Sequence, residues 1–343
     1  MKIIIDAMSG DKAPGEIVRG AVLARQESRV EIVLVGQEQA VRRELSAAGA
    51  GNDAGITVVN AAEIIDMHDD PSTAVRRKKD SSMAVALNLL RDGEGDAMVS
   101  AGNTGALLTG ATLTVKRIRG IRRACMAPVL PVGRYGAMLI DCGANVECTP
   151  EYLLQFAYMG SFSAKKLRGC PSPRVGLLSN GTEDSKGGPL QKEAYALLKA
   201  AGEQGRINFI GNIEGSDVFA DKAEVIVTDG FTGNVMLKTI EGTAKFLMKN
   251  LKQVMLASTK NKIGAALLKK DMYGLKKLLD VNEVGGTPFL GVKKPVIKAH
   301  GSSDARAIAS AVRQAVAFVN AGVISEIENN IEYMKLRESG ENE

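Results

Sequence analysis

The feature that most limits the possible folds is a repeated order of segments: a short apolar run, a polar loop that contains glycine, and a helix. The expected strands are Lys2–Asp6, Glu31–Val35, Ile56–Val59, Asp96–Ser100, Met126–Leu130, Ala137–Asp141, Arg174–Leu178, Glu224–Thr228 and Val296–Ala299. The expected helices include Pro14–Glu27, Glu38–Ala48, Ser81–Leu90, Pro150–Leu167 and Ala305–Asn320. Continuously apolar strands that alternate with helices are typical of right-handed βαβ units. The sequence therefore predicts an α/β fold with a doubly wound, mostly parallel sheet.

The chain shows no obvious internal boundary. No long linker rich in proline, glycine or serine is present, so residues 1–325 are expected to form one α/β domain, followed by a charged and frayed tail over 326–343. We find neither a signal peptide nor a run of about 20 apolar residues that would span a membrane. The cysteines (Cys125, Cys142, Cys148 and Cys170) lack CxxC spacing, and His68 and His300 lie far apart. We therefore do not expect a zinc site. We expect the cysteines to be reduced thiols in a cytoplasm.

The loop Ser100–Ala106, with the sequence SAGNTGA, has the composition of an anion-binding loop. In open α/β sheets, ligands bind beyond the carboxyl ends of the strands. Glycine lets backbone N–H groups approach a ligand, and the following helix presents its positive end. We predict that Ser100, Gly102, Asn103 and Thr104 bind an anion. The structural alternative is an ordinary helix cap, because all these residue types favour caps.

Two further loops combine glycine with charge. TDGFTGN, residues 228–234, places Asp229 at a strand end, where it either orients a substrate or moves a proton, or only caps the next helix; Gly233 and Asn234 follow as binding candidates. GTEDSKGG, residues 181–188, places Lys186 among glycines. Lysine in such a loop neutralises phosphate or polarises a carbonyl group. Its structural alternative is a solvated lysine.

Histidine and arginine complete the set of candidates. KAHGSSD, residues 298–304, holds His300 at a strand-to-helix junction, whereas His68 lacks a comparable setting and is expected at the surface. AVRRKKD, residues 74–80, places Arg76 just before a helix, where it either contacts an anion or is solvated. The sequence contains no GxGxxG, no GxxxxGK[ST], no GxSxG and no HExxH motif. A standard dinucleotide fingerprint, a P-loop and a serine-hydrolase elbow are thereby excluded.

The stretch over residues 239–280 is expected to form a basic amphipathic helical hairpin. Ten lysines and two acids lie between Lys238 and Leu279, and apolar residues recur at helical spacing. A basic surface favours an acidic protein, an anionic bilayer or nucleic acid as its partner. The candidates for this contact are Lys260, Lys262, Leu267, Leu268 and Lys269. The alternative is a core face with solvated lysines opposite.

The loops occur in an order that resembles one family. DAMSGD, AVRRKKDSSM, SAGNTGAL, DCGAN, GLLSNGTED-SKG, VTDGFTGNVMLKT and IKAHGSSD, from Met1 to about Ile324, resemble the bacterial acyl-ACP:phosphate acyltransferases of phospholipid synthesis. Ser9 departs mildly from this pattern, which has glycine there.

The resemblance implies an enzyme that moves a long-chain fatty acyl group from acyl carrier protein to inorganic phosphate, giving acyl phosphate. It implies a fold like those of phosphate acetyltransferases and isocitrate-type dehydrogenases, a homodimer, and no metal or organic cofactor. It also implies a cytoplasmic protein at the inner face of the cell membrane, no nucleic acid partner, and a membrane glycerol-3-phosphate acyltransferase that consumes the product.

With that chemistry, bound phosphate attacks the thioester directly, and Lys186 or His300 stabilises the carbonyl oxygen, while Asp229 orients a neighbour or shares a proton. Two rival functions stay open. One is a CoA-dependent phosphate acyltransferase of the same fold, and the other is a non-catalytic membrane scaffold for lipid enzymes.

Overall fold

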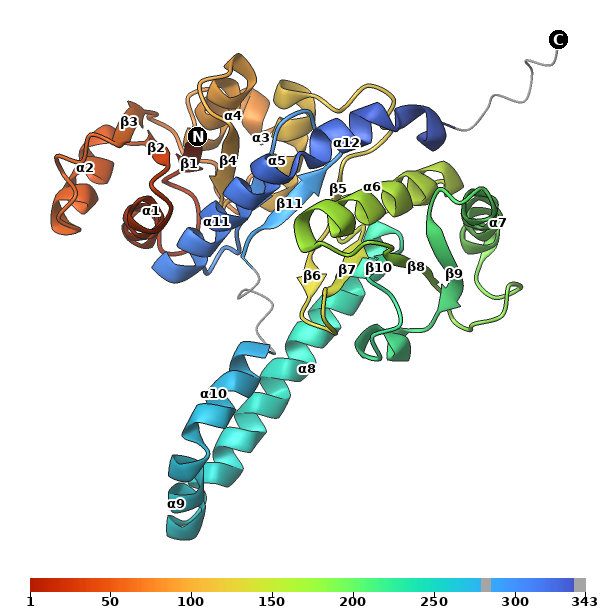
Figure 1. The fold of residues 1–343 in the computed structure, drawn as a ribbon. Helices are drawn as coiled ribbons and strands as arrows, with labels where there is room; N and C mark the ends of the chain where they lie inside the picture. Colours follow the sequence, from red (N-terminus) through yellow and green to blue (C-terminus); the bar gives the residue numbers. More distant parts are fainter. Residues whose placement is uncertain (279–284, 336–343) are drawn as a thin grey trace.

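The computed structural model describes residues 1–278 and 285–335, which form two mostly parallel sheets surrounded by helices (Figure 1). The first sheet has the strand order β3-β2-β1-β4-β12-β11-β5. Its strands are β1 (Lys2–Asp6), β2 (Glu31–Gly36), β3 (Ile56–Asn60), β4 (Ala97–Ser100), β5 (Cys125–Met126), β11 (Thr287–Leu290) and β12 (Val296–Lys298). From β3 to β12 all neighbours are parallel, and β11 pairs antiparallel with both β12 and β5.

The second sheet has the order β6-β7-β10-β8-β9. It comprises β6 (Val129–Leu130), β7 (Ala137–Ile140), β8 (Arg174–Leu178), β9 (Asn208–Ile213) and β10 (Val225–Val227). Only β6 is antiparallel to its neighbour. The predicted fold class is confirmed, with the strands divided between two sheets.

Apolar side chains on alternating strand positions build a core on each face of the first sheet. Ile3 and Ile5 of β1 pack with α1 (Gly15–Ser28) and α11 (Ala305–Ala321), whereas Ile4 packs with α4 (Ser82–Asp92) and α5 (Thr104–Gly110). This alternation follows from the two-residue period of a strand. α2 (Glu38–Ala47), α3 (Ala74–Arg77) and a π-helical turn (Ala111–Val115) complete this part of the molecule.

One core is shared by the two sheets. Val175 and Val225 of the second sheet belong to the same buried cluster as Ile3, and α6 (Pro150–Arg168) contributes Phe156 and Tyr158 to it. α7 (Pro189–Glu203) packs on α6 and β9, and a 3-10 turn spans Gly215–Phe219. The continuous core is compatible with the single domain expected over residues 1–325.

Two strands, β9 and β11, were not predicted from the sequence. β9 has the sequence NFIGNI, lies at the edge of its sheet and is only partly buried, so its polar positions hide the apolar run. β11 contains Pro288 and pairs through the few residues around it. Proline and asparagine are depleted in strands, which explains both omissions.

The expected hairpin consists of α8 (Gly230–Leu256), α9 (Thr259–Leu267) and α10 (Lys269–Leu278), and Figure 1 shows it extending away from both sheets. No residue from Lys238 to Leu268 is buried. The side chains of Phe246, Ile263 and Leu267 are 65%, 61% and 80% exposed. The last residues of the predicted range, 279–280, lie outside the described residues.

The expected frayed tail is partly wrong. Over residues 326–335 the chain continues α12 (Val323–Asn329) and adds a 3-10 turn (Ile331–Met334), whose Met334 is fully buried. The Gln155 amide donates to the Met334 carbonyl at 3.2 Å. Charge was a poor guide because two apolar side chains, Ile327 and Met334, suffice to anchor the segment. Residues 336–343 lie outside the described range.

The expectation that no apolar stretch reaches membrane-spanning length also needs correction. Among the described residues, Ala305–Asn329 is long and apolar enough by length and composition alone. Its α11 part places Ile308, Val312, Ala315 and Phe318 in the core shared with α1. The chain also adopts a left-handed conformation at Gly322. These contacts are those of a core helix.

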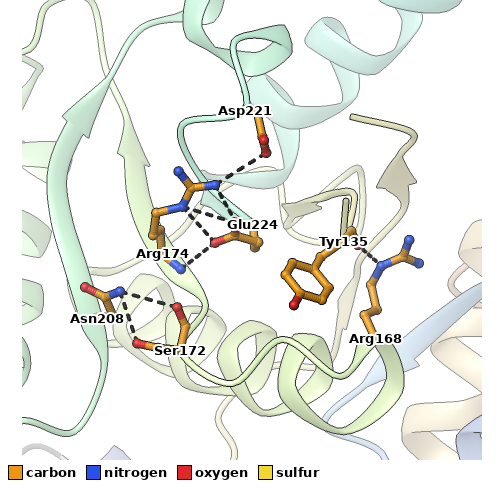
Figure 2. A network of polar contacts seen from close by, with 7 residues as sticks. All are labelled: Tyr135, Arg168, Ser172, Arg174, Asn208, Asp221 and Glu224. Carbon is orange, nitrogen blue, oxygen red and sulfur yellow. Dashed lines mark hydrogen bonds and ion pairs between the residues drawn. The ribbon is translucent and has the colours of Figure 1, made fainter. Parts of the chain in front are cut away.

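A charged network joins the starts of β8 and β10, as Figure 2 shows. The Arg174 guanidinium donates to both carboxylate oxygens of Glu224, at 2.5 and 3.1 Å, and its backbone N–H donates to the same carboxylate at 2.7 Å. Asp221 accepts a further bond from Arg174 at 3.3 Å. The network lies at the amino ends of the strands, opposite the edge where ligands are expected.

Candidate active site

Three adjacent strands of the first sheet end in a row of buried polar residues. Ser100, the last residue of β4, pairs in register with Lys298, the last residue of β12. Asp6 is the last residue of β1 and follows Ile5, which pairs with β4. The Ser100 hydroxyl donates to the Asp6 carboxylate at 2.7 Å. All three residues are buried. A buried polar row at the carboxyl ends of parallel strands is where this fold class binds ligands.

The loops that follow these strands touch one another. The Asp11 N–H donates to the Gly301 carbonyl at 2.8 Å. A Cβ on Gly102 would lie 2.9 Å from the Ser9 hydroxyl, and one on Gly10, whose φ is +114°, would lie 3.1 Å from Ala101 Cβ. Gly10 is favoured by its positive φ, and at Gly102 the side chains of Met83 and Ser9 occupy the space that a Cβ would need. The predicted candidate Gly102 thus lies where the loops of β1 and β4 meet.

Asn103 acts as the cap of α5. Its side-chain oxygen accepts from the Ala106 N–H at 3.1 Å, and its amide nitrogen donates to the Met67 carbonyl at 3.2 Å. Thr104 is the half-buried first residue of the helix. The structure therefore displays the capping role that was the alternative for Asn103, and its role in binding an anion stays a prediction. Arg76 is exposed on α3, which packs against α5.

His300 and Lys298 carry shifted pKa values. Burial lowers the pKa of Lys298 to about 8, with a further lowering by Lys238, while Asp11 and Asp6 act against the shift. Partial desolvation, Lys298 and Lys238 lower the pKa of His300, so its imidazole is neutral near pH 7. The Ser302 N–H donates to His300 Nδ1 at 3.2 Å. Because Nδ1 accepts, the neutral ring carries its proton on Nε2, which is a donor for a ligand.

The second sheet adds its own strand ends. Asp229 caps α8, and its carboxylate accepts from the N–H and the hydroxyl of Thr232, both at 2.8 Å. A Cβ on Gly233 would lie 2.0 Å from the Asp141 carbonyl oxygen, so Gly233 is needed for close packing. Asn234 is exposed and adjoins Gly143. The capping role of Asp229 is thus structural fact, and a further role of Asp229, Gly233 or Asn234 toward substrate stays a prediction.

Asp141 is a buried carboxylate that the motif analysis did not single out. It accepts from the backbone N–H groups of Met126, Cys142 and Asn145, at 2.9, 2.7 and 2.6 Å. Burial raises its pKa, and these hydrogen bonds oppose the rise. The carboxylate therefore fixes the DCGAN loop beneath the start of α8. A charged residue that ends an apolar strand was the available signal, as it was for Lys298 and Asp6.

Helix α8 brings the two sheets together. It begins at Asp229 of the second sheet, and its residues Lys238, Glu241 and Lys245 act electrostatically on His300 of the first sheet. The strand ends of the first sheet therefore face a lysine-bearing helix that starts from the second. Neither Lys238 nor Lys298 was predicted as a site residue: Lys298 begins the KAHGSSD motif, in which His300 was the candidate, and Lys238 lies in the lysine-rich helical stretch.

The comparisons with known proteins agree with this architecture. The fatty acid synthesis protein family matches residues 1–326. A phosphate acyltransferase from Oceanobacillus iheyensis is 47% identical over 97% of this chain and 98% of its own length, and one from a Geobacillus species is 49% identical over 97% and 99%. The chain belongs to the phosphate acyltransferase family. It is an enzyme that transfers an acyl group to phosphate, as the motif order implied.

Solved structures place the fold of this phosphate acyltransferase. A phosphotransacetylase from Streptococcus pyogenes matches with a TM-score of 0.62 at 20% identity, over 95% of this chain and 94% of that one. A branched-chain phosphotransacylase from Enterococcus faecalis matches with 0.56 at 14% identity, over 93% and 99%. A 4-hydroxythreonine-4-phosphate dehydrogenase from Klebsiella pneumoniae gives 0.54 at 13% identity, over 93% and 99%. The expected likeness to phosphate acetyltransferases is confirmed at the level of the fold.

Other predicted residues of the phosphate acyltransferase lie apart from this cluster. Lys186 is exposed, its stem lies against Gly181, and among the described residues it forms no ion pair. The hairpin candidates are all exposed: Lys260, Lys262, Leu267, Leu268 and Lys269. His68 is exposed as expected. The structure thus brings His300 and Ser100 into one cluster, whereas Lys186 lies in the loop between β8 and α7 and its role stays a prediction.

Proposed function

We propose that this phosphate acyltransferase moves a long-chain fatty acyl group from acyl carrier protein to inorganic phosphate by direct attack. The observation that carries the proposal is the buried row Asp6–Ser100–Lys298, which faces the lysines of α8 beside His300. Such a site offers positive charge and hydrogen-bond donors at the place where this fold class binds ligands. The family membership supports phosphate as the acceptor.

The transfer follows from the charges of the reactants. Near pH 7 much of the phosphate is the dianion HPO4²⁻, so it needs positioning more than deprotonation. A phosphate oxygen forms a bond to the thioester carbonyl carbon, and the carbon–sulfur bond then breaks. The departing thiolate takes the proton that the phosphate carried, giving acyl phosphate dianion and a free thiol. The Nε2–H of His300 is a suitable donor for the carbonyl oxygen as negative charge develops there.

The carrier protein as donor is supported by the charge of the hairpin. Ten lysines and two acids between Lys238 and Leu279 favour an acidic protein over a small thioester. The same segment leads through α8 directly to the cluster around His300. A CoA-dependent reaction remains the alternative, because both donors use the same phosphate chemistry.

The experiment is phosphate-dependent release of free carrier from a defined acyl carrier thioester by purified enzyme. We expect release that saturates with phosphate and stops in its absence, and much lower kcat/KM with the matching acyl-CoA. Equal or better turnover of acyl-CoA would assign the donor to CoA. No turnover of either thioester would favour the non-catalytic scaffold.

The setting of the reaction belongs to the same proposal. Acyl phosphate is amphiphilic and labile in water, so release at the inner face of the cell membrane hands it to a membrane glycerol-3-phosphate acyltransferase. The exposed apolar residues of the hairpin, together with its lysines, suit an anionic bilayer. A homodimer is proposed from the family resemblance, and light scattering of the purified protein at several concentrations tests it.

A further inference from the structure

Lys298 is a buried cation without an ion pair among the described residues. It is 8% exposed, and its ammonium group donates to the carbonyl of the neighbouring Ala299. An ammonium group has three N–H donors, so this bond leaves two donors unused. A buried charge is strongly unfavourable unless it is paired or binds a ligand. The position therefore calls for an anion that the described residues, 1–278 and 285–335, do not supply.

The nearest carboxylates do not fill this role. Asp6 accepts from the Ser100 hydroxyl at 2.7 Å and from the Met8 N–H at 3.4 Å. Asp11 is exposed. Both carboxylates act on Lys298 electrostatically, but neither lies within 4.0 Å of its ammonium nitrogen in the described part of the chain. Lys298 keeps a charge that is offset only at longer range.

A second polar group in the same loops also lacks a partner. The Ser9 hydroxyl is buried, with a residue exposure of 2%, and has no hydrogen-bond partner in the part of the chain that the structure describes. It belongs to the loop after β1 and lies against Gly102 in the loop after β4. Buried polar groups without partners are uncommon in folded proteins, and each calls for an explanation such as a catalytic role or a bound water or ion. Lys298, with two donors unused, and Ser9, with its hydroxyl unpartnered, therefore lie at the carboxyl ends of β12 and β1, the two strands that flank β4 in the sheet.

We propose that the ammonium group of Lys298 binds the phosphate acceptor directly and holds it for attack on the thioester. The inference deepens the proposed function and rests on phosphate being the acceptor. In the attack described above, Lys298 exchanges no atom or electron with the reactants, and it offsets the negative charge of the phosphate. Lys298 belongs to a strand and pairs in register with Ser100, so its side chain starts from a rigid backbone. A lysine on a rigid strand is better suited to position a substrate than an exposed loop lysine such as Lys186.

The test compares phosphate binding by Lys298→Met with that by the wild type. Methionine keeps the length and packing of the side chain and removes the charge. The control is Lys293→Met, at an exposed lysine before the other end of the same strand. Melting temperatures are measured with increasing inorganic phosphate and with chloride at equal ionic strength, in the absence of any acyl donor.

We expect phosphate to raise the melting temperature of the wild type and of Lys293→Met, because a ligand that binds the native state stabilises it. Without phosphate, Lys298→Met should melt no lower than the wild type, and its phosphate response should vanish. The kcat/KM for phosphate should fall about a hundredfold, which is the usual effect of removing one positioned hydrogen-bond donor. The KM for the acyl donor should stay unchanged.

An unchanged phosphate response in Lys298→Met would overturn the inference. If Lys298→Met melts lower without phosphate, Lys298→Gln is measured by calorimetric phosphate titration at a temperature where both proteins are folded. Wild-type phosphate affinity in Lys298→Gln would then assign Lys298 a structural role only, and lost affinity would support the inference. The titration uses no acyl donor, so a failure of the carrier protein as donor leaves its outcome intact. A wild type that binds no phosphate would instead count against the proposed function itself.

Discussion

Asp229 shows how one side chain can serve structure and chemistry at the same place. Its carboxylate caps the longest helix of the described chain through the N–H and the hydroxyl of Thr232. The same residue lies just after β10, beside the loop that Asp141 fixes. An asparagine cap keeps an oxygen that accepts from the Thr232 N–H, and its NH2 group donates to the Thr232 hydroxyl in place of the second carboxylate oxygen, but the charge is removed. Substitutions that separate these two properties therefore test whether the carboxylate acts on the substrate.

We predict that Asp229→Asn keeps the stability of the wild type but loses most turnover, whereas Asp229→Ala loses both. Asparagine is a good helix cap, and replacing such a cap by alanine typically costs about 1 kcal/mol. Urea unfolding measures the first effect and carrier release measures the second. Full turnover in Asp229→Asn would leave Asp229 as a cap alone.

Pairs of elements are held together by specific charges as well as by the core. The Arg174–Glu224 pair in Figure 2 joins β8 to β10 at the amino ends of these strands. Burial alone would raise the pKa of Glu224, but the hydrogen bonds from Arg174 overcome this effect and hold the pKa below its usual value of 4.5. A carboxylate with a lowered pKa stabilises the fold above its unfolded pKa, and that stability is lost as the pH falls through the folded pKa.

We predict that Glu224→Gln lowers the free energy of unfolding by about 1.5–3 kcal/mol at pH 7, the range for a hydrogen bond to a charged group. The difference from the wild type should shrink as the pH falls below 4.5. Urea unfolding between pH 7 and pH 3.5 measures both effects. The control is Glu332→Gln, whose exposed pair with Lys335 should contribute less than about 1 kcal/mol. Equal losses in both variants, or a difference that does not depend on pH, would contradict this account.

At the scale of the whole molecule, helix α8 connects the candidate active site to the hairpin. α8 starts at the site and carries an exposed apolar and basic surface out to α9 (Figure 1). Leu267 and Leu268 lie at the end of α9, 80% and 49% exposed. Exposed apolar side chains of this size, flanked by lysines, are typical of a surface that enters a bilayer interface.

We predict salt-sensitive binding to vesicles that contain anionic lipid, weakened by Leu267→Glu or Leu268→Glu with soluble turnover retained. Each lysine near an anionic surface contributes about 1 kcal/mol, and this attraction is screened by salt. The control is Leu113→Glu, because Leu113 is exposed on the body of the protein, outside the hairpin. If vesicle flotation depends neither on lipid charge nor on these two substitutions, the prediction is wrong and the hairpin is an interface between protein surfaces.

Local patterns predicted most of the elements and many of the candidate residues. Apolar runs with polar ends located β1, β4 and β12, because burial on both faces of a sheet demands continuous apolar sequence. The lysine-rich helical repeat likewise located the hairpin, since its period is a property of neighbouring residues. The ordered motifs indicated the phosphate acyltransferase family. All these signals lie within a few residues of one another along the chain.

Tertiary structure alone decided which loops meet. Asp6, Ser100 and Lys298 become neighbours through strand pairing between distant parts of the chain, and this pairing depends on the packing of whole sheets. The same packing buried Lys298, left Lys186 exposed and anchored Met334 in a segment whose charge suggested a frayed tail. Burial and charge pairing are sums over many distant neighbours, so local sequence identifies the charged residues but not which of them become buried.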